Sequence, residues 1–173
     1  MSTLTVKELA APTGFDLKIA AGETLDLKSQ GTVTMPAGAV LQVVNMTYGT
    51  TQAITSTSWA DTGLTLAITP SSTSSKIRID YSFYNIHFGA TASGLAFRIT
   101  RNGSSIFTPT AAHGDYVTSG GYHWGRNGIA IDSPSSTSAV TYKIQVQGYN
   151  TNLVTINSSS AWRDNLVLTE IAG

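Results

Sequence analysis

The sequence alternates apolar and polar residues with a period of two, most clearly over residues 64–79 and 140–146. Successive side chains of a β-strand point to opposite faces, so this pattern predicts strands with one buried and one solvated face. Polar tracts such as 70–75 and 132–138 interrupt the pattern and are typical of turns. The alternation therefore predicts an all-β chain of antiparallel strands.

Turn residues divide the chain into short segments. Asn102-Gly103 is a strong signal for a two-residue β-hairpin, because both residues tolerate the positive φ of a type I′ turn. Strands are predicted near 39–49, 52–57, 63–69, 76–88, 94–101, 104–108, 125–132, 139–150, 153–157 and 162–172. About eight to ten strands of this length fit two packed sheets. We expect a jelly-roll-like antiparallel β-sandwich over residues 39–173.

The alternation also predicts which side chains face the core. They are Leu64, Leu66, Ile68, Ile77, Ile79, Tyr81, Phe83, Leu95, Phe97, Ile99, Val140, Tyr142, Ile144 and Val146. After Phe83 the pattern changes phase, and Asn85 and His87 occupy positions that would otherwise face inward. Two explanations fit this change: a β-bulge, which inserts one extra residue and exchanges the faces, or burial on both sides, inside the domain and against another subunit.

The composition excludes several classes of partner and site. The net charge is zero and charged residues make up 12% of the chain, so no basic surface is expected to bind nucleic acid. The chain contains no cysteine, which excludes disulfides and thiolate-bound zinc. No apolar run is long enough for a membrane span, and the first nine residues lack the pattern of a signal peptide. We therefore expect synthesis in the cytoplasm without membrane insertion.

Residues 1–38 differ from the rest of the chain. They contain one aromatic residue, Phe15, and many proline and glycine residues, so their short strands cannot bury a core alone. We interpret them as an attachment arm or stalk that partners order; a loosely ordered leader is the alternative. The run 40–46 is more apolar than a half-buried strand requires, and burial on both faces would explain it. Candidate assembly residues are Leu4, Val6, Leu9, Phe15, Leu17, Leu25, Leu27, Val40, Val43 and Val44.

Four segments resemble a family of tail-fibre and virion-appendage proteins of bacteriophages, notably marine and cyanobacterial phages. Residues 35–44, Met-Pro-Ala-Gly-Ala-Val-Leu-Gln-Val-Val, are similar to the junction that leads into the distal domain of these proteins. Residues 59–64 and 69–77 resemble the next two segments, and 166–171, Leu-Val-Leu-Thr-Glu-Ile, resembles the closing strand. The similarity spans nearly the whole chain in the same order.

The resemblance implies a virion structural protein, typically a homotrimer. In this family the N-terminal part attaches to another virion protein and the C-terminal β-domain faces outward. The implied location is the virion, after synthesis in the host cytoplasm. Two functions remain open: a fibre or appendage that binds a host-surface glycan or protein, and a decoration protein with a structural role and no dedicated ligand. The resemblance transfers no catalytic residue and no cofactor.

Residues 108–127 are the best candidate for a binding region, because aromatic, polar and glycine residues gather there in a long connection. Aromatic rings can stack on sugars and the polar groups can bond hydroxyls. The candidate residues are His113, Asp115, Tyr116, Tyr122, His123, Trp124, Arg126 and Asn127. The alternative is that Tyr122 and Trp124 belong to a strand and pack in the core or at a threefold contact.

Catalytic and metal sites are not expected. His113, Asp115 and His123 could ligate a divalent ion, but their spacing matches no diagnostic metal motif. The sequence contains no nucleophile elbow, zinc-protease helix or phosphate-binding loop. A glycosidase would need two carboxylates at a defined separation, and Asp80 and Asp132 are the pair that strands could bring together. We expect a protein without enzymatic activity, cofactor or metal.

Overall fold

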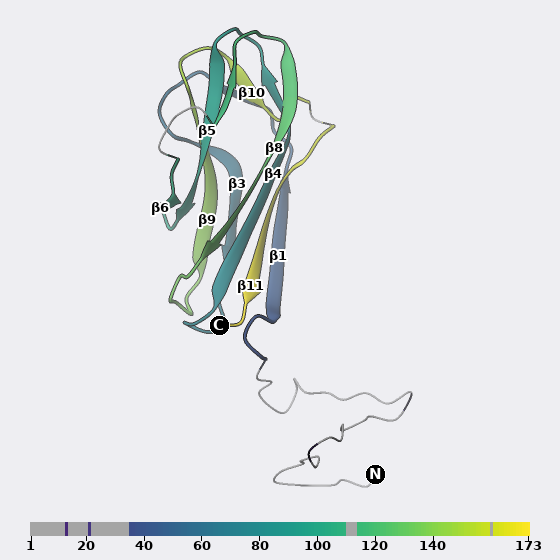
Figure 1. Ribbon diagram of the computed structural model, residues 1–173, viewed down its shortest axis with the longest axis vertical. Helices are drawn as coiled ribbons and strands as arrows, with labels where there is room; N and C mark the ends of the chain where they lie inside the picture. The colour runs from purple at the N-terminus through teal and green to yellow at the C-terminus, as the bar shows by residue number, and fades with distance from the viewer. Residues whose placement is uncertain (1–12, 14–20, 22–34, 110–113, 160) are drawn as a thin grey trace. The chain divides into compact units, whose positions relative to one another are not determined.

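The computed structural model describes residues 13, 21, 35–109, 114–159 and 161–173 (Figure 1). The chain divides into two units, Met1–Thr34 and Met35–Gly173, and the second contains every described strand. The predicted arm therefore lies almost entirely outside the described residues. So do its candidate assembly residues Leu4, Val6, Leu9, Phe15, Leu17, Leu25 and Leu27.

The described residues form eleven strands and no helix, which confirms the all-β prediction. No segment among them is a helix of the length and apolarity needed to cross a membrane. The strands are β1 Val40–Tyr48, β2 Gln52–Ile54, β3 Ala60–Ile68, β4 Lys76–Phe88, β5 Ser93–Arg101, β6 Ser104–Phe107, β7 Asp115–Val117, β8 Tyr122–Asp132, β9 Val140–Gly148, β10 Val154–Ile156 and β11 Asp164–Ile171.

The strands form two antiparallel sheets that pack as a sandwich, as predicted (Figure 1). Sheet A has the order β1-β11-β4-β10-β2, and β8 also pairs with β4. Strand β8 follows one edge of β4 from Ile77 to Phe88, while β11 and β10 share the other edge at its two ends. Sheet B has the order β3-β9-β5-β6, with β7 also paired to β5.

The hydrophobic core lies between the two sheets. All the predicted inward side chains are buried except Leu66, which is partly buried against the core. Phe83 of β4 stacks on Phe97 of β5 with ring centroids 4.7 Å apart, and Tyr81 contacts both rings. Aromatic packing across the gap therefore joins sheet A to sheet B at mid-height.

Strand β4 contains a β-bulge, the first of the two explanations that the sequence left open. Its register with β8 shifts between Phe83 and Ile86, where β4 has one residue more than β8. Phe83 and Ile86 are both fully buried, so the two residues between them, Tyr84 and Asn85, are displaced from the core. The bulge explains the change of phase in the sequence and places two successive side chains on the outer side of sheet A.

Other turn signals had mixed outcomes. Asn102 and Gly103 have φ values of 49° and 86°, which confirms the predicted hairpin between β5 and β6. Strand β3 begins at Ala60 rather than near residue 63, because a bulge that includes Gly63 (φ 88°) continues the strand instead of starting it. The prediction of one long connection over 108–127 is wrong: β7 lies within it, and β8 begins at Tyr122 rather than at 125.

The sandwich has two distinct ends. At the proximal end β1 begins and β11 finishes, and the Gly38 N–H donates a hydrogen bond to the Ala172 carbonyl (2.8 Å). At the distal end β4 finishes and β8 begins, with Phe88 paired to Tyr122. The segment that follows residue 34 therefore enters at the proximal end, and the first half of β8 lies at the distal end (Figure 1).

Truncation of two neighbouring residues tests the bulge. Phe83→Ala removes a fully buried ring and should cost about 3–5 kcal/mol of unfolding free energy. Tyr84→Ala removes a ring that is 49% exposed and should cost less than about 1 kcal/mol. Chemical denaturation of both variants measures the difference; equal losses would contradict the assignment of these side chains to opposite faces.

Candidate functional site

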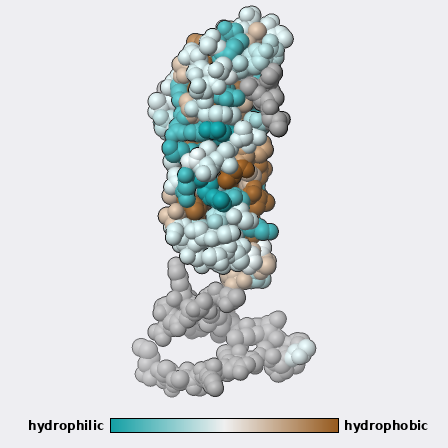
Figure 2. All heavy atoms as spheres, turned by 90° about the vertical axis from the view of Figure 1, so that its left-hand side faces the viewer, coloured by the Kyte–Doolittle hydropathy of each residue, from teal (hydrophilic) through white to brown (hydrophobic). Residues whose placement is uncertain are grey.

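Exposed large apolar side chains segregate by type along the sandwich. Most of the aromatic ones lie at the distal end, whereas the aliphatic ones lie mainly towards the proximal end. On the face drawn in Figure 2, the most hydrophobic side chains gather around mid-height, with hydrophilic ones beside them. The distal set is Tyr84, Tyr116, Tyr122, Trp124, Tyr149, Leu153 and Trp162. The remaining set is Met35, Val40, Val43, Phe107, Ile129 and Ile131. The distal end is therefore the candidate site.

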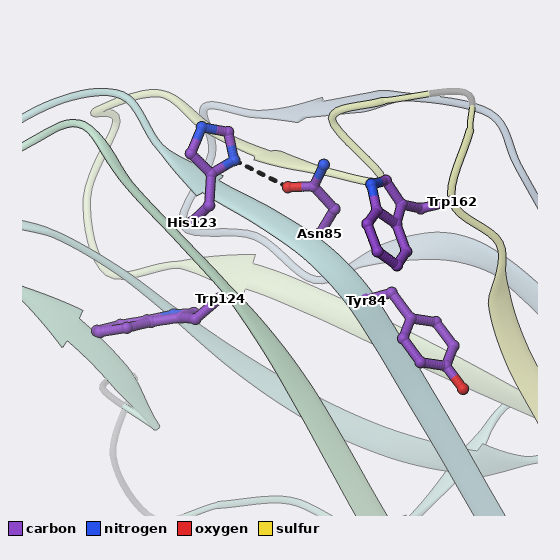
Figure 3. A pocket seen from close by; sticks show the side chains of 5 residues that line it. All are labelled: Tyr84, Asn85, His123, Trp124 and Trp162. Carbon is purple, nitrogen blue, oxygen red and sulfur yellow. Dashed lines mark hydrogen bonds between the residues drawn. The ribbon is translucent and has the colours of Figure 1, made fainter.

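An open pocket of about 370 Å³ lies on the outer side of sheet A at this end (Figure 3). The bulge of β4 supplies Tyr84 and Asn85, and the connection before β11 supplies Trp162. The rings of Tyr84 and Trp162 are nearly parallel, 19° apart, with centroids 6.4 Å from each other. Both rings are about half exposed, at 49% and 52%.

His123 of β8 completes the polar side of this pocket. Its Nδ1 lies 2.8 Å from Asn85 Oδ1 in a hydrogen bond that joins the bulge to the neighbouring strand (Figure 3). The imidazole also stacks on His87, its partner in the strand register, with centroids 4.3 Å apart. Two neighbours therefore fix the orientation of the His123 ring.

Alternation divides the predicted binding residues of β8 between the two faces of sheet A, although His123 and Trp124 line the same pocket at the distal end. Tyr122, Trp124 and Arg126 pair with the buried residues of β4 and lie on its inner side. His123 and Asn127 lie on the outer side, and Asn127 is paired with Ser82 towards the middle of the sheet. Tyr122 and Trp124 belong to a strand, as the alternative predicts, but both are exposed rather than packed in the core. Their packing at a threefold contact stays a prediction.

Trp124 lines two pockets. It forms one edge of the pocket described above, with its ring pointing away from the other four side chains (Figure 3). It also lines a second open pocket of about 230 Å³ with Tyr116, Val117, Thr118 and Tyr122. The indole is 40% exposed and packs edge-on against Phe88, with centroids 5.1 Å apart. Trp124 is therefore anchored by the core and still accessible.

Asp115 and Arg126 form an ion pair that connects the two sheets. Asp115 Oδ1 accepts a hydrogen bond from Arg126 Nη1 at 3.0 Å, which links β7 of sheet B to β8 of sheet A. Burial raises the pKa of Asp115, and the Arg126 charge and hydrogen bond act against that rise. Because the acid is mostly covered and already paired, we assign it to sheet packing rather than to ligand contact.

The buried carboxyl group of Asp164 in β11 supports the bulge of β4. Asp164 at the start of β11 is 1% exposed, and its Oδ1 accepts a hydrogen bond from the Tyr84 N–H (3.1 Å). Burial raises the pKa of Asp164 to about 6, with the Tyr84 hydrogen bond opposing the rise. This contact holds the displaced segment of β4 against β11.

Two further expectations concern a candidate metal site and a candidate pair of catalytic carboxylates. His113 lies outside the described residues, and among those described no three histidine, aspartate or glutamate side chains gather as a metal site would require. Asp80 faces outward in an ion pair with Arg78, while Asp132 faces inward and contacts Arg101 and Tyr142. These two carboxylates lie on opposite sides of sheet A and cannot act together on one substrate.

Sequence reasoning missed Tyr84, Asn85 and Trp162. Tyr84 and Asn85 lie in a strand whose alternation predicts mainly core positions, and the pattern predicts Trp162 at the start of the last strand. The change of phase after Phe83 was the available signal, because a bulge displaces side chains from the core. The contact between Tyr84 and Trp162 joins residues far apart in the sequence, so no local pattern could reveal it.

The sequence matches no protein-family model and no curated protein. Among solved structures, the VP2 subviral particle of infectious bursal disease virus is similar at a TM-score of 0.42 and 12% identity, covering 87% of this chain and 42% of that chain. The Gx strain of this virus gives 0.42 and 12%, with 86% and 42% covered, and its T13 particle gives 0.39 and 12%, with 86% and 39% covered. The chain spans about two fifths of these proteins.

Substitution of the buried carboxyl group tests its protonation. The native pKa of Asp164 is above its ordinary value of 3.8, so the folded state binds more protons than the unfolded state between about pH 4 and 6. The contribution of Asp164 to stability is therefore largest below pH 4 and is lost as the pH rises through 6. Asp164→Asn should remove this loss, worth up to about 3 kcal/mol.

Thermal or chemical unfolding of wild type and Asp164→Asn from pH 4 to 7 measures the effect. The stability of the variant relative to wild type should increase from about pH 4 to about pH 6 and then level off. A constant offset between the two curves would show that Asp164 has the same affinity for protons in both states.

Proposed function

We propose that this protein is a bacteriophage virion structural protein, a fibre or appendage whose distal end attaches to the host surface. The observation that carries the proposal is the separation of the two ends of the sandwich. The chain enters at the proximal end, and the exposed aromatic side chains lie at the distal end. The resemblance of residues 35–44 and 166–171 to phage appendage proteins supports the same orientation.

The distal aromatic residues have the properties of a recognition surface. Large exposed apolar patches on proteins mark interaction sites, and tryptophan and tyrosine contribute most strongly to binding energy. Trp124 and Trp162 are held by ring contacts at positions that leave about half of each side chain accessible. A surface that binds no ligand would not require exposed aromatic side chains to gather at one end of the sandwich.

The alternative is a decoration protein with a purely structural role. It predicts that the distal aromatic residues contact a neighbouring virion protein or solvent and have no dedicated ligand. We favour attachment because the distal pockets combine rings with hydrogen-bonding groups such as those of Asn85 and His123. Both alternatives place the protein in the virion, after synthesis in the host cytoplasm.

The proposal includes a homotrimer, with the N-terminal segment bound to another virion protein. Val40 and Val43 of β1 are 56% and 57% exposed, although they lie in a strand with a strongly apolar sequence. Val44 faces the other way and packs against the core of its own chain. Burial of Val40 and Val43 by a second copy would complete the two-sided burial that the sequence predicts. The zero net charge gives weak repulsion between copies.

Truncation of Trp124 tests attachment. Trp124→Ala in the particle should reduce adsorption to host cells more than tenfold, equivalent to about 1.4 kcal/mol, because the residue lines both distal pockets. The melting temperature of the Trp124→Ala protein should fall less than that of the Phe83→Ala protein. Phe107→Ala is the matched control, since it removes an exposed ring from β6, away from the distal end. Unchanged adsorption by a folded Trp124 variant would favour the decoration role.

A charge on β1 tests assembly. Val43→Lys should shift the mass measured by sedimentation equilibrium from trimer towards monomer, because a buried unpaired ammonium group is costly. Thr47→Lys is the control. Thr47 lies on the same face of β1 as Val43, next to the last residue of the strand, and its side chain is exposed. A wild-type monomer, or an equal effect of both substitutions, would remove Val43 from the proposed interface.

A further inference from the structure

We infer that the pocket formed by Tyr84, Asn85, His123 and Trp162 binds a neutral sugar residue of a host-surface polysaccharide. The inference rests on the proposed function for its setting, since that proposal brings the distal end to the host. The rings, the polar atoms and the formal charge of the lining side chains each point to this class of ligand.

The two rings offer an apolar surface for the C–H face of a sugar ring. Tyr84 of β4 and Trp162 of the connection before β11 are nearly parallel, so the contact between the two rings joins separate parts of the chain. Tyr84 is fixed by the bulge and by the hydrogen bond from its N–H to Asp164. Amphipathic rings that are held in place can bind with little loss of conformational entropy.

The polar side of the pocket matches a hydroxyl group. When Asn85 Oδ1 accepts the hydrogen bond from His123 Nδ1, the Asn85 Nδ2 group is left as a donor and Nε2 of the neutral imidazole as an acceptor. Neither atom makes a hydrogen bond to another side chain in the described part of the structure. A hydroxyl both donates and accepts, so it can pair with this donor and this acceptor at once.

The lining side chains favour a neutral ligand. The lining side chains of tyrosine, asparagine, tryptophan and histidine add up to zero formal charge when histidine is counted as neutral. The carboxyl group of Asp164 is buried against the Tyr84 N–H and does not line the pocket. The guanidinium of Arg163 packs over Gly49 and does not line the pocket. An acidic sugar would therefore lack a cationic partner here, while a cationic ligand would lack an accessible anion.

The open shape fits one residue of a polymer. The volume of about 370 Å³ is within the range of small-ligand pockets, which is about 300–1,000 Å³. An open pocket leaves room for the chain on both sides of the bound residue. Low affinity at each site would be compensated by several copies on one particle.

The full chain can be titrated with neutral polysaccharides (dextran, a galactan and a mannan) and acidic ones (alginate and hyaluronan), with tryptophan fluorescence as the signal. We expect saturable binding of at least one neutral polymer and none of the acidic ones. Trp162→Ala and Asn85→Ala should each weaken this binding more than tenfold, Trp162→Phe should retain part of it, and Phe107→Ala should leave it unchanged. Thermal melts confirm that each variant is folded.

Three results would overturn the inference: no binding of any neutral polymer by the folded wild type, binding of acidic polymers alone, or unchanged affinity in both the Trp162→Ala and Asn85→Ala variants. Adsorption assays separate this inference from the proposed function. If Trp124→Ala abolishes adsorption and no neutral polymer binds, attachment stands and the sugar site fails. If the sugar binds but Trp162→Ala particles adsorb normally, the site stands and its role in attachment fails.

Discussion

The pairing of β4 with β8 is the constraint on which the distal surface depends. Strand β8 forms the outer edge of sheet A, and two ion pairs tie it to sheet B: Asp132 with Arg101 towards the proximal end, and Arg126 with Asp115 towards the distal end. Between these ties its inward residues include Gly128, where even a Cβ atom would collide with the Tyr81 ring. Small residues in the middle and ionic contacts at both ends hold β8 close to the core.

A second polar contact closes the proximal end. Glu170 is fully buried, and its carboxylate accepts hydrogen bonds from Gln42, from Ser75 and from both the N–H and the hydroxyl of Ser71. Burial alone would raise the pKa of Glu170, but these hydrogen bonds outweigh it and lower the pKa. Few charged residues occur in this chain, and several of them join separate elements. The chain therefore has few charges on its surface because several of its charged side chains make contacts within the fold.

The sequence predicted the core more fully than the site. Alternation identifies inward residues such as Ile79 and Ile144 because the two-residue period of a strand is local. It also located the change of phase after Phe83, which proved to be a bulge. The division of Tyr122, His123 and Trp124 between two faces could have followed from the same rule, but the start of β8 was placed three residues too late. The segment just before β8 is rich in glycine and has the composition of a turn, which obscured the start of the strand.

The remaining part of the site could not be predicted from local pattern. The approach of Trp162 to Tyr84, and of Asn85 to His123, depends on which strands are neighbours in sheet A. Strand order is a global property set by the packing of both sheets, and one sequence contains it only implicitly. The ion pair between Asp115 and Arg126 is hidden for the same reason, and the sequence alone predicts the two residues only as candidate ligand contacts.

The position of Trp162 has an evolutionary consequence. This residue lies in the connection between β10 and β11, outside the hydrogen-bonded ladders, whereas the neighbouring Asp164 is already part of the buried framework. Substitutions at Trp162 can therefore alter what the distal pocket accepts while the folding of the sandwich is preserved. If the pocket contacts the host, specificity and stability can diverge independently in this protein, and a lineage could change hosts through one connecting loop.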